Sequence, residues 1–179
     1  MTKLLIGDNP KGDFKVRKGL SVLLVISLLI LPGCIGGGGS KSDPVSHSEI
    51  NSFFALYAYR FETGDLDGVL DMYQLPVKAT YEGSSVEVTI TELSDLSDMM
   101  ADNLEMRTSY NTINIQAIVE SVTGTTSNAL AKVIIIAEGF DDSGKTIITS
   151  KVQYGLVKSS GKWRIRSEHW IDQNERWEP

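Results

Sequence analysis

The last third of the sequence consists almost entirely of segments that alternate as β-strands do, and this pattern limits the possible folds most. The four segments lie at 110–122, 128–140, 146–158 and 162–171. Turn-forming residues separate the last three, as Asp141-Asp142-Ser143-Gly144 and Ser159-Ser160-Gly161. Short turns of this composition are typical of β-hairpins. We therefore predict that this part of the chain forms a sheet of hairpin-connected strands.

Three helices are predicted before these strands, each with a recognisable start. Ser46-His47-Ser48-Glu49 has the spacing of a capping box, and an apolar stripe follows it up to Gly64. Asp65 can cap a second, shorter helix that continues through Tyr73, and Thr91 opens a third. Two short strands are predicted between the second and third helices, around Lys78–Tyr81 and Val86–Ile90. The predicted order is α-α-β-β-α-β-β-β-β, within one α+β domain over residues 46–179.

Two loose motifs accompany this order. The segment Tyr59-Arg60-Phe61-Glu62-Thr63-Gly64-Asp65 joins the first two helices, and Gly161-Lys162-Trp163-Arg164-Ile165 opens the last strand. Over residues 46–171 the chain thereby resembles the nuclear transport factor two-like superfamily, which includes ketosteroid isomerase and the SnoaL-like polyketide cyclases. The resemblance implies three amino-terminal helices packed on a strongly curved, mainly antiparallel sheet that encloses a conical cavity. It also implies a homodimer through the outer face of the sheet, as in many members.

Residues 1–33 are predicted to be a lipoprotein signal peptide. Basic residues precede an uncharged apolar run from Leu20 to Leu31. This run is about a dozen residues long, whereas a helix that crosses a membrane needs about 20. Its end, Leu31-Pro32-Gly33-Cys34, resembles the prokaryotic lipobox. That resemblance implies cleavage between Gly33 and Cys34 and a diacylglycerol on the Cys34 thiol. Met1 and Val16 are alternative starts of translation, and both give the same mature protein.

Residues 34–45 are predicted to be the lipidated cysteine and a flexible tether. Gly36 to Gly39 are consecutive glycines, and the polar residues after them cannot bury apolar area. Because such lipoproteins are exported, we expect the folded domain to lie in the cell envelope, outside the cytoplasm, held to a membrane through Cys34. The sequence does not indicate which membrane.

Charge and composition exclude several functions. Of the 17 basic and 23 acidic residues, five and two lie in residues 1–33, so the rest of the chain carries 12 and 21, a net charge of −9. A body this acidic has no basic face for nucleic acid. The single cysteine excludes disulfides, dithiol chemistry and cysteine-based zinc sites, and the two histidines, His47 and His169, exclude a histidine-rich metal site. A metal site that mixes histidine with carboxylates is not excluded, but no such set of residues is recognisable, and we expect no metal ion. The sequence also has no phosphate-binding loop, and we expect no cofactor.

One pair of residues is a candidate for acid–base chemistry. Strand alternation predicts that Trp163, Ile165 and His169 share the face toward the cavity, with Glu168 on the opposite face. His169 with Tyr57 could then exchange protons near neutral pH. In the alternative interpretation, His169 forms a hydrogen bond at a strand end and Tyr57 packs in the core.

Two functional classes therefore stay open. The tyrosine and two aspartates that ketosteroid isomerase uses do not map onto this sequence. The segment 128–140 is apolar on both faces, which predicts a place in the middle of the sheet or an outer face that meets another surface. Both observations favour a non-catalytic module that binds a small apolar ligand or a partner protein. The alternative is a small isomerase, dehydratase or cyclase that uses His169.

Overall fold

The computed structural model describes residues 43–178, and the predictions for the signal peptide, Cys34 and the tether up to residue 42 lie outside the described residues. Ser42–Pro179 form a compact unit with its own hydrophobic core. Within the described part of the chain, no helix is long and apolar enough to cross a membrane.

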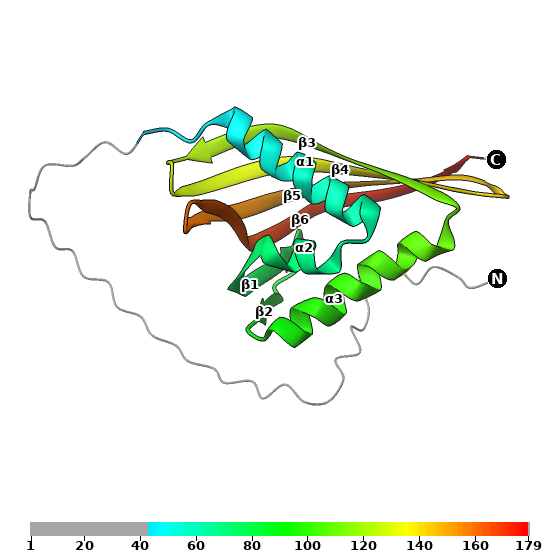
Figure 1. The fold of residues 1–179 in the computed structure, drawn as a ribbon, viewed down its shortest axis with the longest axis horizontal. Coiled ribbons are helices and arrows are strands. Elements are labelled where there is room, and N and C mark those ends of the chain that lie inside the picture. Colours follow the sequence, from blue (N-terminus) through cyan, green and yellow to red (C-terminus); the bar gives the residue numbers. More distant parts are fainter. Residues whose placement is uncertain (1–42, 179) are drawn as a thin grey trace, which may run out of the picture. The chain divides into compact units, whose positions relative to one another are not determined.

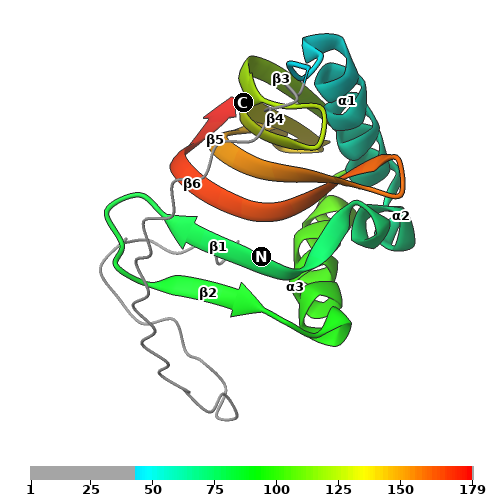
Figure 2. The ribbon, with the colours of Figure 1, turned by 90° about the vertical axis from the view of Figure 1, so that its left-hand side faces the viewer.

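The observed order of elements is the predicted one. The elements are α1 (His47–Thr63), α2 (Leu66–Asp71), β1 (Tyr73–Tyr81), β2 (Glu87–Ile90), α3 (Leu93–Glu105), the 3₁₀ helix η1 (Met106–Ser109), β3 (Thr112–Gly124), β4 (Asn128–Asp141), β5 (Gly144–Ser159) and β6 (Lys162–Glu178). They form one six-stranded sheet in the order β2-β1-β6-β5-β4-β3. Neighbouring strands are antiparallel, except that β1 and β6 run parallel. Figures 1 and 2 show this sheet curving, with the helices on one side of it. The prediction of an α+β fold with a curved, mainly antiparallel sheet is confirmed.

The ends of α1 follow the predicted signals. The Ser46 side chain accepts a hydrogen bond from the backbone N–H of Glu49, 3.4 Å away, and so caps the helix. Gly64 ends it in the left-handed conformation, with φ 74°, which glycine adopts without steric cost. The prediction for the next helix was wrong at its end, because α2 ends at Asp71 and Tyr73 already begins β1. Tyr73 pairs there with Ile165 of β6, a contact distant in sequence that overrides the local helical pattern.

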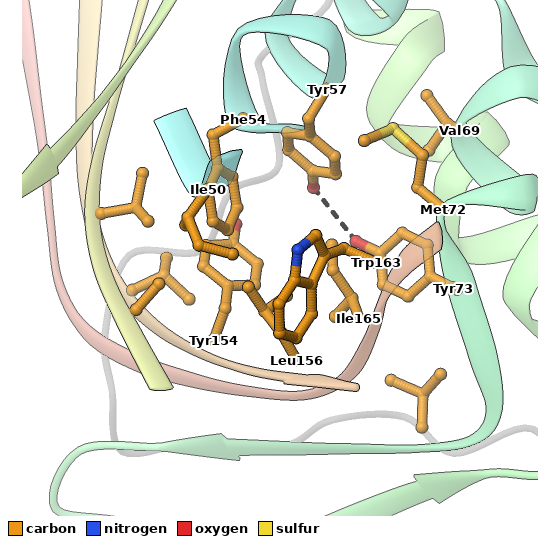
Figure 3. Packing of buried hydrophobic residues seen from close by; sticks show 14 of the residues in the cluster. Ile50, Phe54, Tyr57, Val69, Met72, Tyr73, Tyr154, Leu156, Trp163 and Ile165 are labelled. Atoms are coloured by element: carbon orange, nitrogen blue, oxygen red, sulfur yellow. Dashed lines mark hydrogen bonds between the residues drawn. The ribbon is translucent and has the colours of Figure 1, made fainter. Parts of the chain in front are cut away.

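The core lies between the helices and the concave face of the sheet. Phe54 and Tyr57 of α1 point toward Tyr154 of β5 and toward Trp163 and Ile165 of β6 (Figure 3). The ring centroids of Phe54 and Tyr154 are 4.8 Å apart, within the range of favourable aromatic pairs. Under α1, the space that the family resemblance assigned to a conical cavity is therefore filled by aromatic side chains.

β4 lies between β5 and the edge strand β3, one position in from the edge of the sheet. The prediction that it lies in the middle of the sheet, buried on both faces, was wrong. Its inner residues Ala131 and Val133 are buried in the core, whereas Leu130 on the outer face is 50% exposed. On β3, Ile118 is exposed on that same outer face, opposite Ile134 of β4.

Candidate functional site

A β-bulge in β6 decides which side chains of this strand face the core. Gly155 of β5 pairs with Ser167, but the next residue, Leu156, pairs with Ile165. Arg166 is thus the extra residue, and the alternation of faces shifts by one after it. Glu168 consequently joins Ile165 on the inner face. The prediction that His169 lies on the concave side was wrong, because alternation continues through a strand only while its register is unbroken.

Glu168 ends a hydrogen-bonded chain in the core. Its side chain is almost fully buried, with 4% of the residue exposed. Tyr73 Oη donates to Oε1 at 2.6 Å, and Trp170 Nε1 donates to Oε2 at 3.2 Å. Tyr57 Oη lies 3.0 Å from Tyr73 Oη. Since the one hydroxyl proton of Tyr73 points to Glu168, Tyr57 is the donor to Tyr73 (their contact is dashed in Figure 3).

The electrostatics of this network are those of a carboxylate without a counter-ion. Burial raises the pKa of Glu168, and the hydrogen bonds from Tyr73 and Trp170 oppose that rise. Burial, followed by the charge of Glu168, raises the pKa of Tyr73 well above its ordinary value. Among residues 43–178, no cationic side chain forms an ion pair with Glu168. A buried, perturbed carboxyl of this kind is suited to proton transfer.

Beside this network, a groove of about 550 Å³ opens between α2, α3 and the beginning of β1. Its apolar lining comes from Leu70 of α2, Leu75 of β1 and Leu93 and Leu96 of α3, and Tyr73 also lines it. Tyr73 therefore belongs both to the groove and, through its hydroxyl, to the Glu168 network. We call this hollow the leucine groove.

An irregular stretch of β1 provides one wall of the leucine groove. Tyr73 pairs with Ile165, and the next paired residue is Lys78, with Ser167. The intervening residues of β1 do not follow β6 in regular pairing, and Gln74 and Leu75 among them line the groove. A bulge that redirects side chains in this way is common next to binding sites.

The leucine groove also has polar residues in its lining, among them Gln74, Asp71 and Arg164. The side-chain oxygen Oε1 of Gln74 is buried, and no donor within the described range reaches it. The Arg164 guanidinium donates to Asp71 Oδ1 at 3.1 Å and to the backbone oxygen of Tyr73 at 3.4 Å. An unpaired buried acceptor costs free energy.

The two predicted acid–base candidates lie in different surroundings. Tyr57 is in the core, whereas the His169 side chain is 37% exposed on the outer face. His169 Nδ1 lies 2.8 Å from Thr80 Oγ1, and His169 Nε2 lies 2.9 Å from Glu82 Oε2. The structure does not bring His169 and Tyr57 together. Instead it joins Tyr57 to Tyr73 and Glu168, which the sequence analysis did not select.

The sequence carries only a weak signal for the missed residues. Glu168 stands two positions before Trp170, on a strand whose other acidic residues, Asp172, Glu175 and Glu178, are all less buried. The bulge that turns Glu168 inward depends on pairing with β5, which neighbouring residues in the sequence do not specify. For metals, the described side chains include no group of three or more potential histidine, cysteine or carboxylate ligands.

Comparison with known proteins assigns the fold. Residues 48–172 match the family described as NTF2-like protein (DUF6841). No curated protein matches the sequence.

Several solved structures have a similar fold. A candidate scytalone dehydratase from Novosphingobium aromaticivorans superposes with a TM-score of 0.58 at 10% identity, over 72% of this chain and 85% of that chain. An NTF2-like protein with a cystatin-like fold from the same organism has a TM-score of 0.56 at 11% identity, over 69% and 79%. The Kfla4162 protein of Kribbella flavida has a TM-score of 0.55 at 17% identity, over 71% and 91%. At these identities the similarity concerns the fold alone.

Proposed function

The chain belongs to the NTF2-like family (DUF6841), and we propose that its domain binds a small, mostly apolar molecule in the leucine groove. One observation carries this proposal: the groove combines four leucines with a buried amide oxygen that has no hydrogen-bond donor within residues 43–178. Binding sites for small molecules typically have such an apolar lining with a few placed polar groups. The ligand that fits is an apolar compound with one hydroxyl or N–H group.

We also propose that the domain acts from a membrane surface, through a lipid on Cys34. The basic region, the apolar run and the cysteine of the lipobox support this anchor, as does the glycine tether after it. A tethered module of this kind would hold an apolar molecule close to the membrane. Labelling of the full chain with a radioactive fatty acid in its host tests the anchor. Label should appear in the natural chain and be lost in Cys34→Ser.

The leucine groove is tested with the unit Ser42–Pro179 and the neutral fluorophore phenylnaphthylamine. We expect saturable binding, and we expect Leu93→Glu to weaken it by about tenfold, because the new carboxylate must be desolvated beside the ligand. Leu93 is 56% exposed, so this change leaves the core intact. The matched control is Leu56→Glu, on the exposed side of α1 and 44% exposed, which should bind as the natural protein does. Equal affinities for the two variants would contradict the proposal.

The buried carboxylate supports a second candidate function. Glu168 is bonded by two neutral donors, and Tyr73 connects it to the leucine groove. This arrangement is favourable for a general acid or base, as an isomerase, dehydratase or cyclase would need. The domain purified from its own host and examined by native mass spectrometry provides the test. A co-purified molecule that fresh protein converts, and that Glu168→Gln leaves unchanged, would establish an enzyme. A molecule that fresh protein leaves unchanged would favour the binding module.

A further inference from the structure

A second hollow, of about 480 Å³, lies away from the leucine groove and extends from β1 across β6, β5 and β4 to β3. We call it the arginine hollow. Gly155, which pairs with Leu130 on the outer face, lines it. A Cβ atom on Gly155 would stand 2.2 Å from Ser167 Oγ, so the Ser167 side chain would have to move to admit a larger residue.

The arginine hollow has cationic and hydroxyl groups in its lining and no carboxylate among its described lining residues. Arg166, the bulge residue of β6, is exposed and makes no ion pair with any acid in the described part of the chain. Lys78 of β1 also lines it, and its ammonium group contacts Glu87 at 2.9 Å. Thr123 and Ser167 add hydroxyl groups. A free guanidinium with a second cation and hydroxyl donors is the donor set that phosphate groups prefer.

The first described residues pass the rim of the arginine hollow. Pro44 forms a β-bridge with Thr125, and the backbone N–H of Val45 donates to the oxygen of Gly124 at 3.4 Å. Gly124 is itself a lining residue. Nine residue steps separate Asp43 from Cys34 in the sequence. A fully extended chain spans at most about 3.5 Å per residue, so a lipid on Cys34 would lie within roughly 30 Å of this rim.

We propose that the arginine hollow binds the phosphate group of a membrane phospholipid, with Arg166 as the main ligand. The inference rests on the proposed lipid anchor, which would keep the hollow near the headgroups. Leu130, 50% exposed, lines the same hollow and offers an apolar contact for the glycerol and upper acyl region of the lipid. Because the domain as a whole is acidic, contact with an anionic membrane would be most favourable at a surface such as this one, which carries no carboxylate among its lining residues.

Vesicle co-sedimentation with the unlipidated unit Ser42–Pro179 tests this inference independently of the anchor and of the leucine groove. We expect binding to vesicles of phosphatidylglycerol and phosphatidylcholine that weakens as salt is added. The double variant Lys78→Gln, Arg166→Gln should bind roughly thirtyfold more weakly, since each basic side chain at an anionic lipid surface contributes about fivefold. The control is Arg176→Gln, which removes one positive charge elsewhere on β6 and should bind almost as the natural protein does. Unchanged thermal unfolding of the variants shows that they are folded.

Three results would overturn the inference. The first is an equal affinity of the double variant and of Arg176→Gln for the vesicles. The second is a protein that binds inorganic phosphate but does not bind vesicles, since the ligand would then be free phosphate. Phosphate binding is detected by shifts of the backbone amide signals near Arg166. The third is a stable dimer in sedimentation equilibrium that Leu130→Asp dissociates, because a second copy of the chain would then cover the hollow.

Discussion

Glu168 and His169 are neighbours on β6, but they lie in opposite environments. Glu168 points into the core, where Tyr73 and Trp170 donate to it. His169 points outward, where it contacts Thr80 and Glu82 within reach of water. Each side chain has two polar partners, so the number of contacts does not distinguish them. Burial does, because a hydrogen bond lost in the core leaves groups that water cannot reach.

The comparison also concerns function. Before the structure is known, a histidine is the natural choice for proton transfer, since its ordinary pKa is near neutral. In this fold the buried carboxyl has the raised pKa, because the bulge at Arg166 turns it away from solvent. The environment of a group therefore determines its chemical role more than its residue type does. Three predictions test this difference between the two faces, beginning with the largest expected effect.

Glu168→Ala should destabilise the domain by about 3 kcal/mol, because it leaves two buried donors unpaired and opens a cavity. Urea unfolding at neutral pH, followed by tryptophan fluorescence, measures this loss. Glu168→Gln is the matched control, since it keeps an acceptor for Tyr73 and removes the buried charge, and it should change the free energy of unfolding by less than about 1 kcal/mol. A loss for Glu168→Ala as small as that of its control would mean that the network does not stabilise the core.

The second prediction concerns pH. Burial raises the pKa of Glu168 above its ordinary value of 4.5, so the folded state holds this proton more tightly than the unfolded state does. Its contribution to stability is therefore fully present below pH 4.5 and is lost as the pH rises through the folded-state pKa. As the pH rises over this range, the free energy of unfolding of the natural protein should fall relative to that of Glu168→Gln. The expected fall is about 1.4 kcal/mol for each unit by which folding raises the pKa of Glu168.

Urea unfolding of both proteins from about pH 4 to about pH 8 measures this difference. Groups common to the two proteins, such as Glu49 and Asp141, cancel in the comparison, although their own pKa values are lowered by hydrogen bonds. A difference in stability that stays constant over this range would show that Glu168 has an ordinary pKa.

The smallest effect is expected on the outer face. His169→Gln should change the free energy of unfolding by less than about 1 kcal/mol, because exposed polar and ionic contacts contribute little. It should also leave ligand binding in the leucine groove unchanged, which the phenylnaphthylamine titration measures. If this variant lost ligand binding, or lost several kcal/mol of its free energy of unfolding, the outer face and not the core would hold the more important of the two groups.

Much of the fold could be predicted from local sequence. The Ser46 cap, the Gly64 stop and the turn at Asp141–Gly144 each depend on a few neighbouring residues, and all three occur where they were expected. The order of helices and strands follows from such signals and from apolar periodicity. The family resemblance added the curvature of the sheet.

The candidate site could be predicted only in part. Tyr57 was predicted either to exchange protons with His169 or to pack in the core, and the structure places it in the core, next to partners that were not identified. Tyr73 was assigned to a helix, and Glu168 was assigned to the outer face. Both errors arise where β6 meets another strand, at the pairing of Tyr73 with Ile165 and at the bulge opposite Gly155.

The sequence by itself determined the element order, the acidic charge of the body and the resemblance of residues 31–34 to a lipobox. These are properties of composition and of residues within a few positions of one another. Only the tertiary structure decided which face of β6 carries Glu168 and which carries His169. A single extra residue reverses the alternation of a strand, and where that residue lies depends on pairing with a strand that is distant along the chain.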